Sequence, residues 1–510
     1  MATTLEQLRN AISRLKLDDS LLFLNHLLAV SRGEKSDAGI DPFCRARKAG
    51  VPAFLVHFFA KQLLLHASNL GIIELDGQRY LQLLDLFFQL DDPICSDPEW
   101  ETADPSGFFE RMLGHQLPAQ RRDRCQLFGL GLGLFRDVGA VRISDTETYD
   151  LRSDIERHLG MSVGEFVAMG FVCGALNRAS HRGHPCPGTF DHVMLAEANV
   201  QGVGVCRPEV WPQFLTRVAC TRDEFRRTCE NPLYRVSDAR YTQFEFNPLV
   251  RFPVIDVGQG RFVTVDPHLL AERTTLGLFY DLFERDRTAF SRRFGYVFDR
   301  FVGNLLGSVC PSESLWWEGD PNRAKPKNAG KVADWAYKGA SRTILFECKS
   351  LRPPLELVTF GSDASVQATR ERIVSAITQL SAHAEAIRLG KWANHGLAQR
   401  PEETVGVVVT YGQLQTVNGP FFRRRILNDL RQNGVAAIIP HVVLSITELD
   451  EVVRLVELGH HLDDVIATMA ATEDSFVPLS RYADAFRDRC SISNFSYTRG
   501  SQLMESVTAN

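Results

Sequence analysis

KVADWAYKGASRTILFECKSLR, from Lys331 to Arg352, is the stretch on which the interpretation of this 510-residue chain rests. Short apolar runs on either side of a Lys-Gly-Ala segment are typical of a β-hairpin. The pattern predicts one strand over 332–337, a turn at 338–340 and a second strand over 342–349.

The hairpin carries two acidic residues and a lysine that alternation assigns to particular faces. Successive side chains of a strand point to opposite faces, so Glu347 and Lys349 share one face, while Phe346 and Cys348 point the other way into apolar packing. We expect Asp334 to lie on the partner strand, close to the turn. The sequence therefore predicts two carboxylates and one ammonium at a sheet surface.

Such a group has a chemical use in phosphodiester hydrolysis. Mg²⁺ binds through one or two carboxylates, retained waters and substrate phosphate oxygens. The ion polarises the phosphoryl oxygen and lowers the pKa of a bound water, and a neighbouring lysine stabilises developing negative charge. The alternative interpretation is an ordinary amphipathic hairpin with a surface Glu–Lys pair.

Asp334, followed after twelve residues by Glu347-Cys348-Lys349, resembles the D…(D/E)xK signature of the PD-(D/E)XK, or restriction-endonuclease-like, nucleases. Ala333 stands where many members have proline. The resemblance implies Mg²⁺, with Mn²⁺ as a substitute, held by Asp334, Glu347 and the main-chain carbonyl of Cys348. It also implies that Lys349 positions the attacking water. Because alternation turns the Cys348 side chain away from the site, we expect it to be a core residue and not a nucleophile.

The elements around the hairpin follow the order expected of that family. The predicted order is helix, three strands, helix, strand, helix and strand, which implies a mixed central sheet flanked by helices over 290–460. The predicted elements are a helix from 290 to 305, a strand at 314–317, the hairpin, a helix over 364–389, a strand at 405–411, a helix over 420–432 and a strand at 435–444.

Two further residues enter through the resemblance alone. Asp299, on the helix before the hairpin, corresponds to an acidic residue that joins the metal site in many members, and a solvated aspartate is the alternative. Gln379, on the helix after the hairpin, corresponds to a glutamine that some members place near the active site. The candidate catalytic set is therefore Asp334, Glu347, Lys349 and Asp299.

The remaining chain divides into three further regions by its hydrophobic periodicity. Residues 1–180 read as mostly helical, 181–289 as a mixed α/β connecting region, and 461–510 as C-terminal helices and a polar tail. We expect the helical region to serve regulation, partner binding or nucleic-acid binding. The fold class is thus α/β (α+β), with a restriction-endonuclease-like domain behind a helical region.

Two other motifs favour structural interpretations. The glycines of GLGLG, residues 129–133, sit inside an apolar helical run and lack the preceding strand of a dinucleotide fingerprint, so they predict close helix packing. A loop with four imidazole or thiol side chains could bind zinc, but its spacing matches no standard site. Those side chains belong to His181, His184, Cys186 and His192.

Composition limits the class of protein. The chain is 44% hydrophobic and 23% charged with a formal net charge of −5, so any nucleic-acid surface must be a local patch. Eleven cysteines without CxxC pairs, and an N-terminus without a basic segment before an apolar core, predict a reduced cytoplasmic protein without a membrane span.

These observations predict a Mg²⁺-dependent endonuclease acting on DNA. A metal site contacts the phosphate and not the sugar, so an RNA- or tRNA-cleaving enzyme stays open, as does a catalytically silent scaffold that binds nucleic acid or protein. A long helical region ahead of a nuclease is similar to bacterial anti-phage effectors. That similarity implies a nuclease kept silent until a protein partner or phage signal releases it. Many relatives work as dimers, so a homo-oligomer is also expected.

Overall fold

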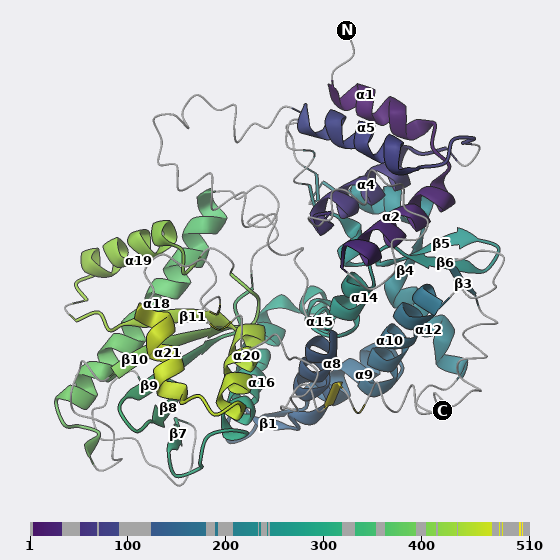
Figure 1. Cartoon of the computed structure of the whole chain (residues 1–510). Coiled ribbons are helices and arrows are strands. Elements are labelled where there is room, and N and C mark those ends of the chain that lie inside the picture. Colours follow the sequence, from purple (N-terminus) through teal and green to yellow (C-terminus); the bar gives the residue numbers. More distant parts are fainter. Residues whose placement is uncertain are drawn as a thin grey trace.

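The structure is a computed structural model. It describes residues 4–32, 51–68, 71–90, 124–179, 189–191, 208–232, 234–235, 242, 245–318, 332–352, 363–393, 404–414, 417–435, 437–471, 479, 482, 499–500 and 502. Figure 1 shows the elements from α16 onward gathered on one side, and the N-terminal helices on the other.

A five-stranded mixed sheet lies at the centre of the C-terminal half. Its strands follow the order β11-β10-β9-β8-β7. The β7–β8 and β8–β9 pairs are antiparallel, whereas the β9–β10 and β10–β11 pairs are parallel. The strands span Leu315–Trp317 (β7), Trp335–Lys338 (β8), Thr343–Lys349 (β9), Thr404–Thr410 (β10) and His441–Ser445 (β11).

Helices cover both faces of this sheet (Figure 1). One face packs against α16 (Arg287–Gly307), α20 (Ile446–Glu457) and α21 (Leu462–Ala471), and the other against α18 (Asp363–Arg388) and α19 (Pro420–Gln432). Every residue of β10 is buried, as expected for a parallel strand covered on both sides. The predicted mixed sheet flanked by helices, and the predicted order of elements, are therefore confirmed.

The hairpin of β8 and β9 is present, but one expectation about it is wrong. The register pairs Lys338 with Thr343 beside the turn and Trp335 with Phe346 at the far end. Asp334 directly precedes β8, so it lies at the open end of the hairpin, next to Glu347, and not close to the turn. Antiparallel pairing causes this, because the residue farthest from the turn on one strand meets the residue farthest from it on the other.

A second sheet organises the N-terminal half, in the order β3-β6-β5-β4. Its strands span Thr189–Asp191 (β3), Ala219–Thr221 (β4), Val254–Gly258 (β5) and Arg261–Thr264 (β6). Side chains of β4, β5 and β6 share a core with four helices, namely α1 (Thr4–Ser13), α2 (Leu17–Ser31), α4 (Ala53–His66) and α5 (Gly77–Phe88). Strands β5 and β6 form an antiparallel hairpin, and β5 begins after a 3₁₀ turn at Pro248–Val250.

The other helices connect the two sheets. Buried side chains of α8, α9, α10, α12, α14 and α15 belong to the same core as α16 and the inner face of the five-stranded sheet. These helices, with the smaller elements beside them, span Arg124–Leu132 (α8), Gly133–Asp137 (a π-helical turn), Val141–Arg142 (β1), Thr148–Tyr149 (β2), Leu151–Leu159 (α9), Val163–Ala179 (α10), Pro208–Val210 (3₁₀), Trp211–Val218 (α12), Arg222–Cys229 (α13), Pro267–Thr274 (α14) and Leu278–Arg285 (α15).

The central glycine of GLGLG, Gly131, lies at a close helix contact, as predicted for this motif. The motif lies where α8 passes into the π-helical turn, and a Cβ built on Gly131 would stand 2.7 Å from the Cβ of Thr275. That distance is shorter than van der Waals contact, so only glycine lets α8 approach the end of α14 this closely.

Two further expectations concern the histidine-rich segment and the absence of a membrane span. The His181–His192 segment with its zinc-like ligands lies outside them, apart from Thr189–Asp191. Within the described ranges, no single helix is long and apolar enough to cross a membrane, and α9 with the first part of α10 passes that test only as a bent pair.

We predict opposite effects of alanine at two helical glycines. Gly131→Ala should destabilise the protein by about 1–3 kcal/mol, because its methyl group overlaps Thr275. Gly295→Ala, in α16, is the matched control. Apart from the neighbouring backbone of its own helix, no heavy atom of the described residues lies within 4 Å of a Cβ built there, so the lower entropy of the unfolded chain should stabilise the protein by about 0.5–1 kcal/mol. Urea unfolding of both variants measures the difference, and equal midpoints would contradict the packing role of Gly131.

Candidate functional site

The open end of the β8–β9 hairpin brings Asp334 onto the backbone of β9. The backbone N–H of Cys348 donates to Oδ2 of Asp334 at 2.6 Å, and this bond fixes the carboxylate beside the strand. Since Trp335 pairs with Phe346, Asp334 continues the register toward Glu347. Two of the predicted residues are thereby neighbours, even though twelve residues separate them in sequence.

Glu347 and Lys349 share the face of β9 that looks toward α18, as the alternation predicted. The ammonium of Lys349 lies 2.5 Å from Oε1 of Glu347, and the side-chain amide of Gln379 donates to Oε2 at 2.7 Å. The Glu347 side chain is 2% exposed and that of Lys349 is 31% exposed, so the pair has one buried end and one end that reaches solvent. The glutamine expected from the resemblance therefore contacts the predicted acid directly.

Helix α18 makes two hydrogen bonds to the peptide group between Val332 and Ala333, just before Asp334. Gln379 donates to the carbonyl oxygen of Val332 at 2.7 Å, and Nδ1 of His383 accepts from the N–H of Ala333 at 3.0 Å. Burial lowers the pKa of His383 to about 3, so the ring is neutral and its Nδ1 is free of a proton to accept this bond. Sequence reasoning missed His383, although its spacing of four residues from Gln379 places both on one helical face.

The opposite face of β9 looks toward α16 and Asp299. The indole N–H of Trp335 donates to Oδ1 of Asp299 at 2.5 Å, and that of Trp317 donates to Oδ2 at 3.0 Å. Gly303, one turn after Asp299, makes room for this arrangement, because a Cβ there would overlap the ring of Trp335. The two tryptophans were not predicted, since indole N–H groups carry no pattern that reveals their tertiary partner.

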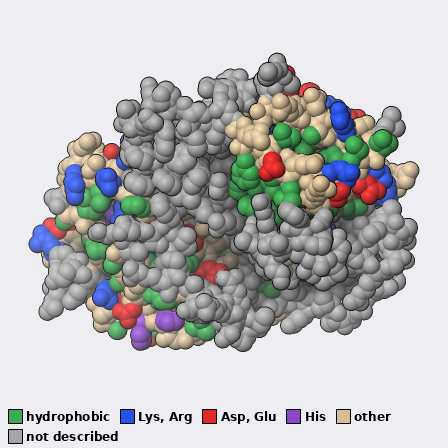
Figure 2. Space-filling model, turned by 45° about the horizontal axis from the view of Figure 1, so that its top comes forward, with side chains coloured by type: hydrophobic (Ala, Val, Ile, Leu, Met, Phe, Trp, Pro, Cys, Tyr) green, Lys and Arg blue, Asp and Glu red, His purple; other side chains and the backbone are tan. Residues whose placement is uncertain are grey.

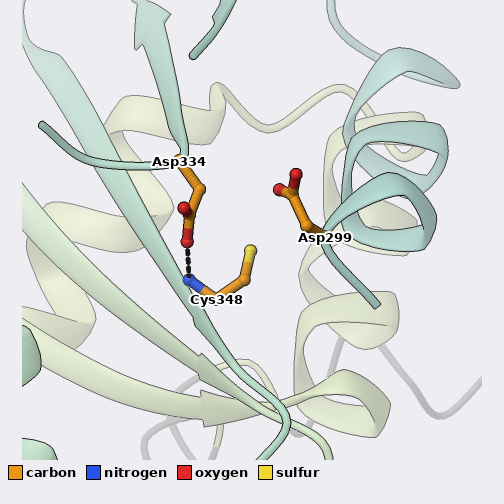
Figure 3. Close-up of side chains that lie close together, drawn as sticks. All are labelled: Asp299, Asp334 and Cys348. Atoms are coloured by element: carbon orange, nitrogen blue, oxygen red, sulfur yellow. Dashed lines mark hydrogen bonds between the residues drawn. The ribbon is translucent and has the colours of Figure 1, made fainter. Parts of the chain in front are cut away.

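The Asp299 carboxylate, the Asp334 carboxylate and the Cys348 sulfur converge between α16 and β9 (Figure 3). Their nearest ligand atoms all lie within 4.8 Å of one another. The expectation that the Cys348 side chain faces away from the site is thus wrong in part. It does point away from Glu347 and Lys349, but Asp299 reaches in from α16 on the side to which the sulfur points.

Burial dominates the electrostatics of the acids. It raises the pKa of Asp334 to about 8, with the Glu347 and Asp299 charges adding to the effect and the Cys348 N–H and Lys349 opposing it. Burial likewise raises the pKa of Glu347 to about 7, against the Lys349 charge. The pKa of Asp299 rises to about 6 for the same reason, although both indole N–H groups favour its charged form.

The site therefore gathers all four candidate residues, in two groups separated by strand β9. Glu347, Lys349 and Gln379 lie toward α18, Asp299 and the Cys348 sulfur lie toward α16, and Asp334 stands between them. Carboxylates and a main-chain carbonyl are donors suited to a hard divalent cation, and a cation would relieve the repulsion between the buried acids. The donor set thus fits a divalent metal ion.

Comparisons of the chain with protein-family models, curated proteins and solved structures found no match.

The raised pKa values predict how stability changes with pH in the metal-free protein. Asp334 binds a proton more tightly in the folded chain than in the unfolded chain, where its pKa is near 3.8. Folded stability should therefore fall as pH rises from about 4 to about 8. Asp334→Asn removes this penalty, so at pH 8 and with EDTA the variant should be more stable than wild type, by on the order of 1 kcal/mol.

The matched comparison is Asp463→Asn, at the start of α21. Bonds from the N–H and hydroxyl of Ser341 lower the pKa of Asp463 despite its burial. Its charged form therefore stabilises the fold above about pH 4, and this variant should be less stable than wild type at neutral pH. Thermal unfolding across pH 4–8 measures both profiles. A destabilising Asp334→Asn at pH 8 would contradict the assignment.

Proposed function

We propose that the protein is a metal-dependent nuclease that hydrolyses DNA phosphodiester bonds, with Asp334, Glu347, Lys349 and Asp299 as its active site. The observation that carries the proposal is that these four side chains lie around the open end of one hairpin, with Glu347 and Lys349 on one face of β9, Asp299 on the other and Asp334 between them. The order of elements around that hairpin, helix, three strands, helix, strand, helix, strand, is the order expected of PD-(D/E)XK nucleases. Convergence and order are independent observations, because one concerns side chains and the other the backbone path.

The metal ion of the proposal is Mg²⁺ or Mn²⁺, held by Asp334, Glu347 and the main-chain carbonyl of Cys348, with Asp299 as a further carboxylate. Bound there, the ion would polarise a phosphoryl oxygen and lower the pKa of a water. Gln379 orients Glu347 through a 2.7 Å hydrogen bond, which holds the carboxylate on the face of β9 that looks toward α18. The site residues thus have support from a rigid helix, as a positioned active site requires.

Lys349 is the group assigned to the developing negative charge. Its ammonium is the exposed partner in an otherwise buried pair, so it can turn from Glu347 toward a phosphate without dragging the acid into solvent. A positioned ammonium stabilises charge that builds on the phosphoryl oxygens in the transition state. In this proposal Lys349 also orients the attacking water.

A nucleic-acid substrate has to be recognised by local charge, since the whole chain is slightly acidic. On the side of the molecule drawn in Figure 2, Lys and Arg side chains of the described residues are interspersed with acidic and apolar ones. Contacts to phosphates are consequently expected to come from separate basic residues, and binding should weaken with salt.

Loss of activity without loss of fold tests the proposal. Glu347→Ala and Lys349→Ala should each reduce Mg²⁺-dependent plasmid nicking by about a hundredfold or more, because they remove a ligand and the charge-stabilising ammonium. Lys338→Ala is the matched control, since that exposed lysine lies at the turn end of the same hairpin. Circular dichroism checks the fold, and wild-type cleavage by both site variants would reject the active site.

The same assay on plasmid, linear DNA and RNA, with and without Mg²⁺, distinguishes the alternatives. Cleavage of RNA alone would favour the RNA- or tRNA-cleaving enzyme. A silent scaffold should cleave none of them and show no calorimetric Mg²⁺ or Mn²⁺ binding that Asp334→Ala removes.

We further propose that the helical region restrains the nuclease until a protein partner or a phage signal arrives, as in an anti-phage effector. Supporting contacts link the two regions: Gln126 of α8 donates to the carbonyl of Thr447 and to the Asp450 carboxylate of α20. In addition, the connecting region contacts the nuclease-like part, because the guanidinium of Arg352, three residues after Lys349, stacks on Tyr280 and Phe283 of α15 at 4.5 and 4.0 Å.

Restraint by the helical region makes a separate prediction. The purified protein alone should nick plasmid slowly, and an extract from phage-infected cells should raise the rate. Glu347→Ala, treated with the same extract, is the control for nucleases that the extract itself supplies. Rapid cleavage by the purified chain, unchanged by the extract, would count against this restraint.

A further inference from the structure

We propose that the sulfur of Cys348 is itself a metal ligand, together with Asp299 and Asp334, and that this site prefers borderline divalent cations such as Co²⁺ and Zn²⁺ over Mg²⁺. The proposal rests on the proposed function only in sharing Asp334 and Asp299 with it. It differs in the donor from residue 348, which is the side chain and not the main-chain carbonyl.

The three candidate ligands lie close together in space. The Cys348 sulfur and one carboxylate oxygen from each aspartate lie within 4.8 Å of one another, so one ion could be reached by all three with small side-chain movements (Figure 3). The three residues come from three elements, namely α16, the segment before β8, and β9. Among the described residues, this is the one group of acidic, histidine and cysteine side chains with such spacing.

Neighbouring hydrogen-bond donors hold both carboxylates in place. Each carboxylate is held by donors that leave further lone pairs available: two indole N–H groups hold Asp299, and the Cys348 N–H holds Asp334. Outer hydrogen bonds of this kind orient metal-binding carboxylates. Cys348 therefore positions Asp334 through its backbone N–H and offers its own sulfur as a second ligand.

The acidic side chains around this group favour a bound cation. Two buried carboxylates face each other here, and Glu347 adds a third negative charge nearby. Lys349, the cation that opposes the charge of Asp334, is paired with Glu347 on the other face of β9. The space between Asp299, Asp334 and the sulfur is thus a place where a positive charge is favoured.

The donor set selects the class of cation. Thiolates are soft ligands that suit zinc, cobalt and similar ions, whereas Mg²⁺ takes oxygen ligands almost exclusively. Two carboxylates with one thiolate form a mixed set, to which water or a substrate oxygen can add. Binding transfers the thiol proton to solvent, which leaves the thiolate that the ion requires.

Cobalt spectroscopy of the full-length protein tests the proposal. Thiolate-to-Co²⁺ charge transfer absorbs in the near ultraviolet, and a site built only from oxygen donors lacks that band. We expect the band to saturate at one equivalent of Co²⁺ and to survive an about hundredfold excess of Mg²⁺. Cys348→Ser should lose the band and bind Co²⁺ about tenfold more weakly or worse.

Two variants keep the experiment interpretable. Cys310→Ser replaces another buried free cysteine, placed after α16 in apolar surroundings, and should retain the band. Asp299→Asn keeps the shape of the side chain and an acceptor for an indole N–H, and should weaken Co²⁺ binding while leaving Cys348 in place. It therefore tests the site even if Cys348→Ser fails to fold.

The outcomes separate this inference from the proposed nuclease activity. Bound Co²⁺ without the band, or a band that Cys348→Ser retains, overturns the thiolate ligand whether or not DNA is cleaved. A band that depends on Cys348 and Asp299 supports it, even if no nucleic acid is hydrolysed with any cation. In that second case the metal site would stand and the nuclease proposal would fail.

Discussion

The candidate site depends on two hydrogen bonds between α18 and the Val332–Ala333 peptide group. Gln379 takes the carbonyl before that peptide bond and His383 takes the N–H after it, so the chain enters β8 along one path. Asp334 follows at once and is tied to β9 by the Cys348 N–H. Because Gln379 also bonds Glu347, one side chain sets the relative position of two acids on different strands.

That rigidity has an electrostatic cost. Asp299, Asp334 and Glu347 are held close together in a poorly solvated region, and the pKa of each is raised. A fold optimised for stability alone would separate such groups or pair each with a cation. Retaining them at a single place is typical of a functional site, where buried like charges are arranged to act on a ligand.

Sequence patterns predicted the parts of this site that follow from strand geometry. Alternation placed Glu347 and Lys349 on one face, and apolar periodicity predicted the helices that carry Asp299 and Gln379. The prediction that Asp334 lies close to the turn was wrong, because antiparallel pairing places this residue, which is far from the turn, beside Glu347 at the far end of the partner strand. Trp317, Trp335 and His383 escaped prediction, since their roles arise from hydrogen bonds between segments that meet only in the folded chain.

The core shared by α8, α10, α16 and the five-stranded sheet has a consequence for how this protein can be inherited or divided. Leu127 and Phe166 are buried in the same apolar cluster as Val407, although more than half of the chain lies between the first and the last. A protein fragment that contains only the C-terminal sheet would expose the apolar side chains of this shared core and should aggregate. Recombination should therefore exchange the sheet and these helices together, as one unit.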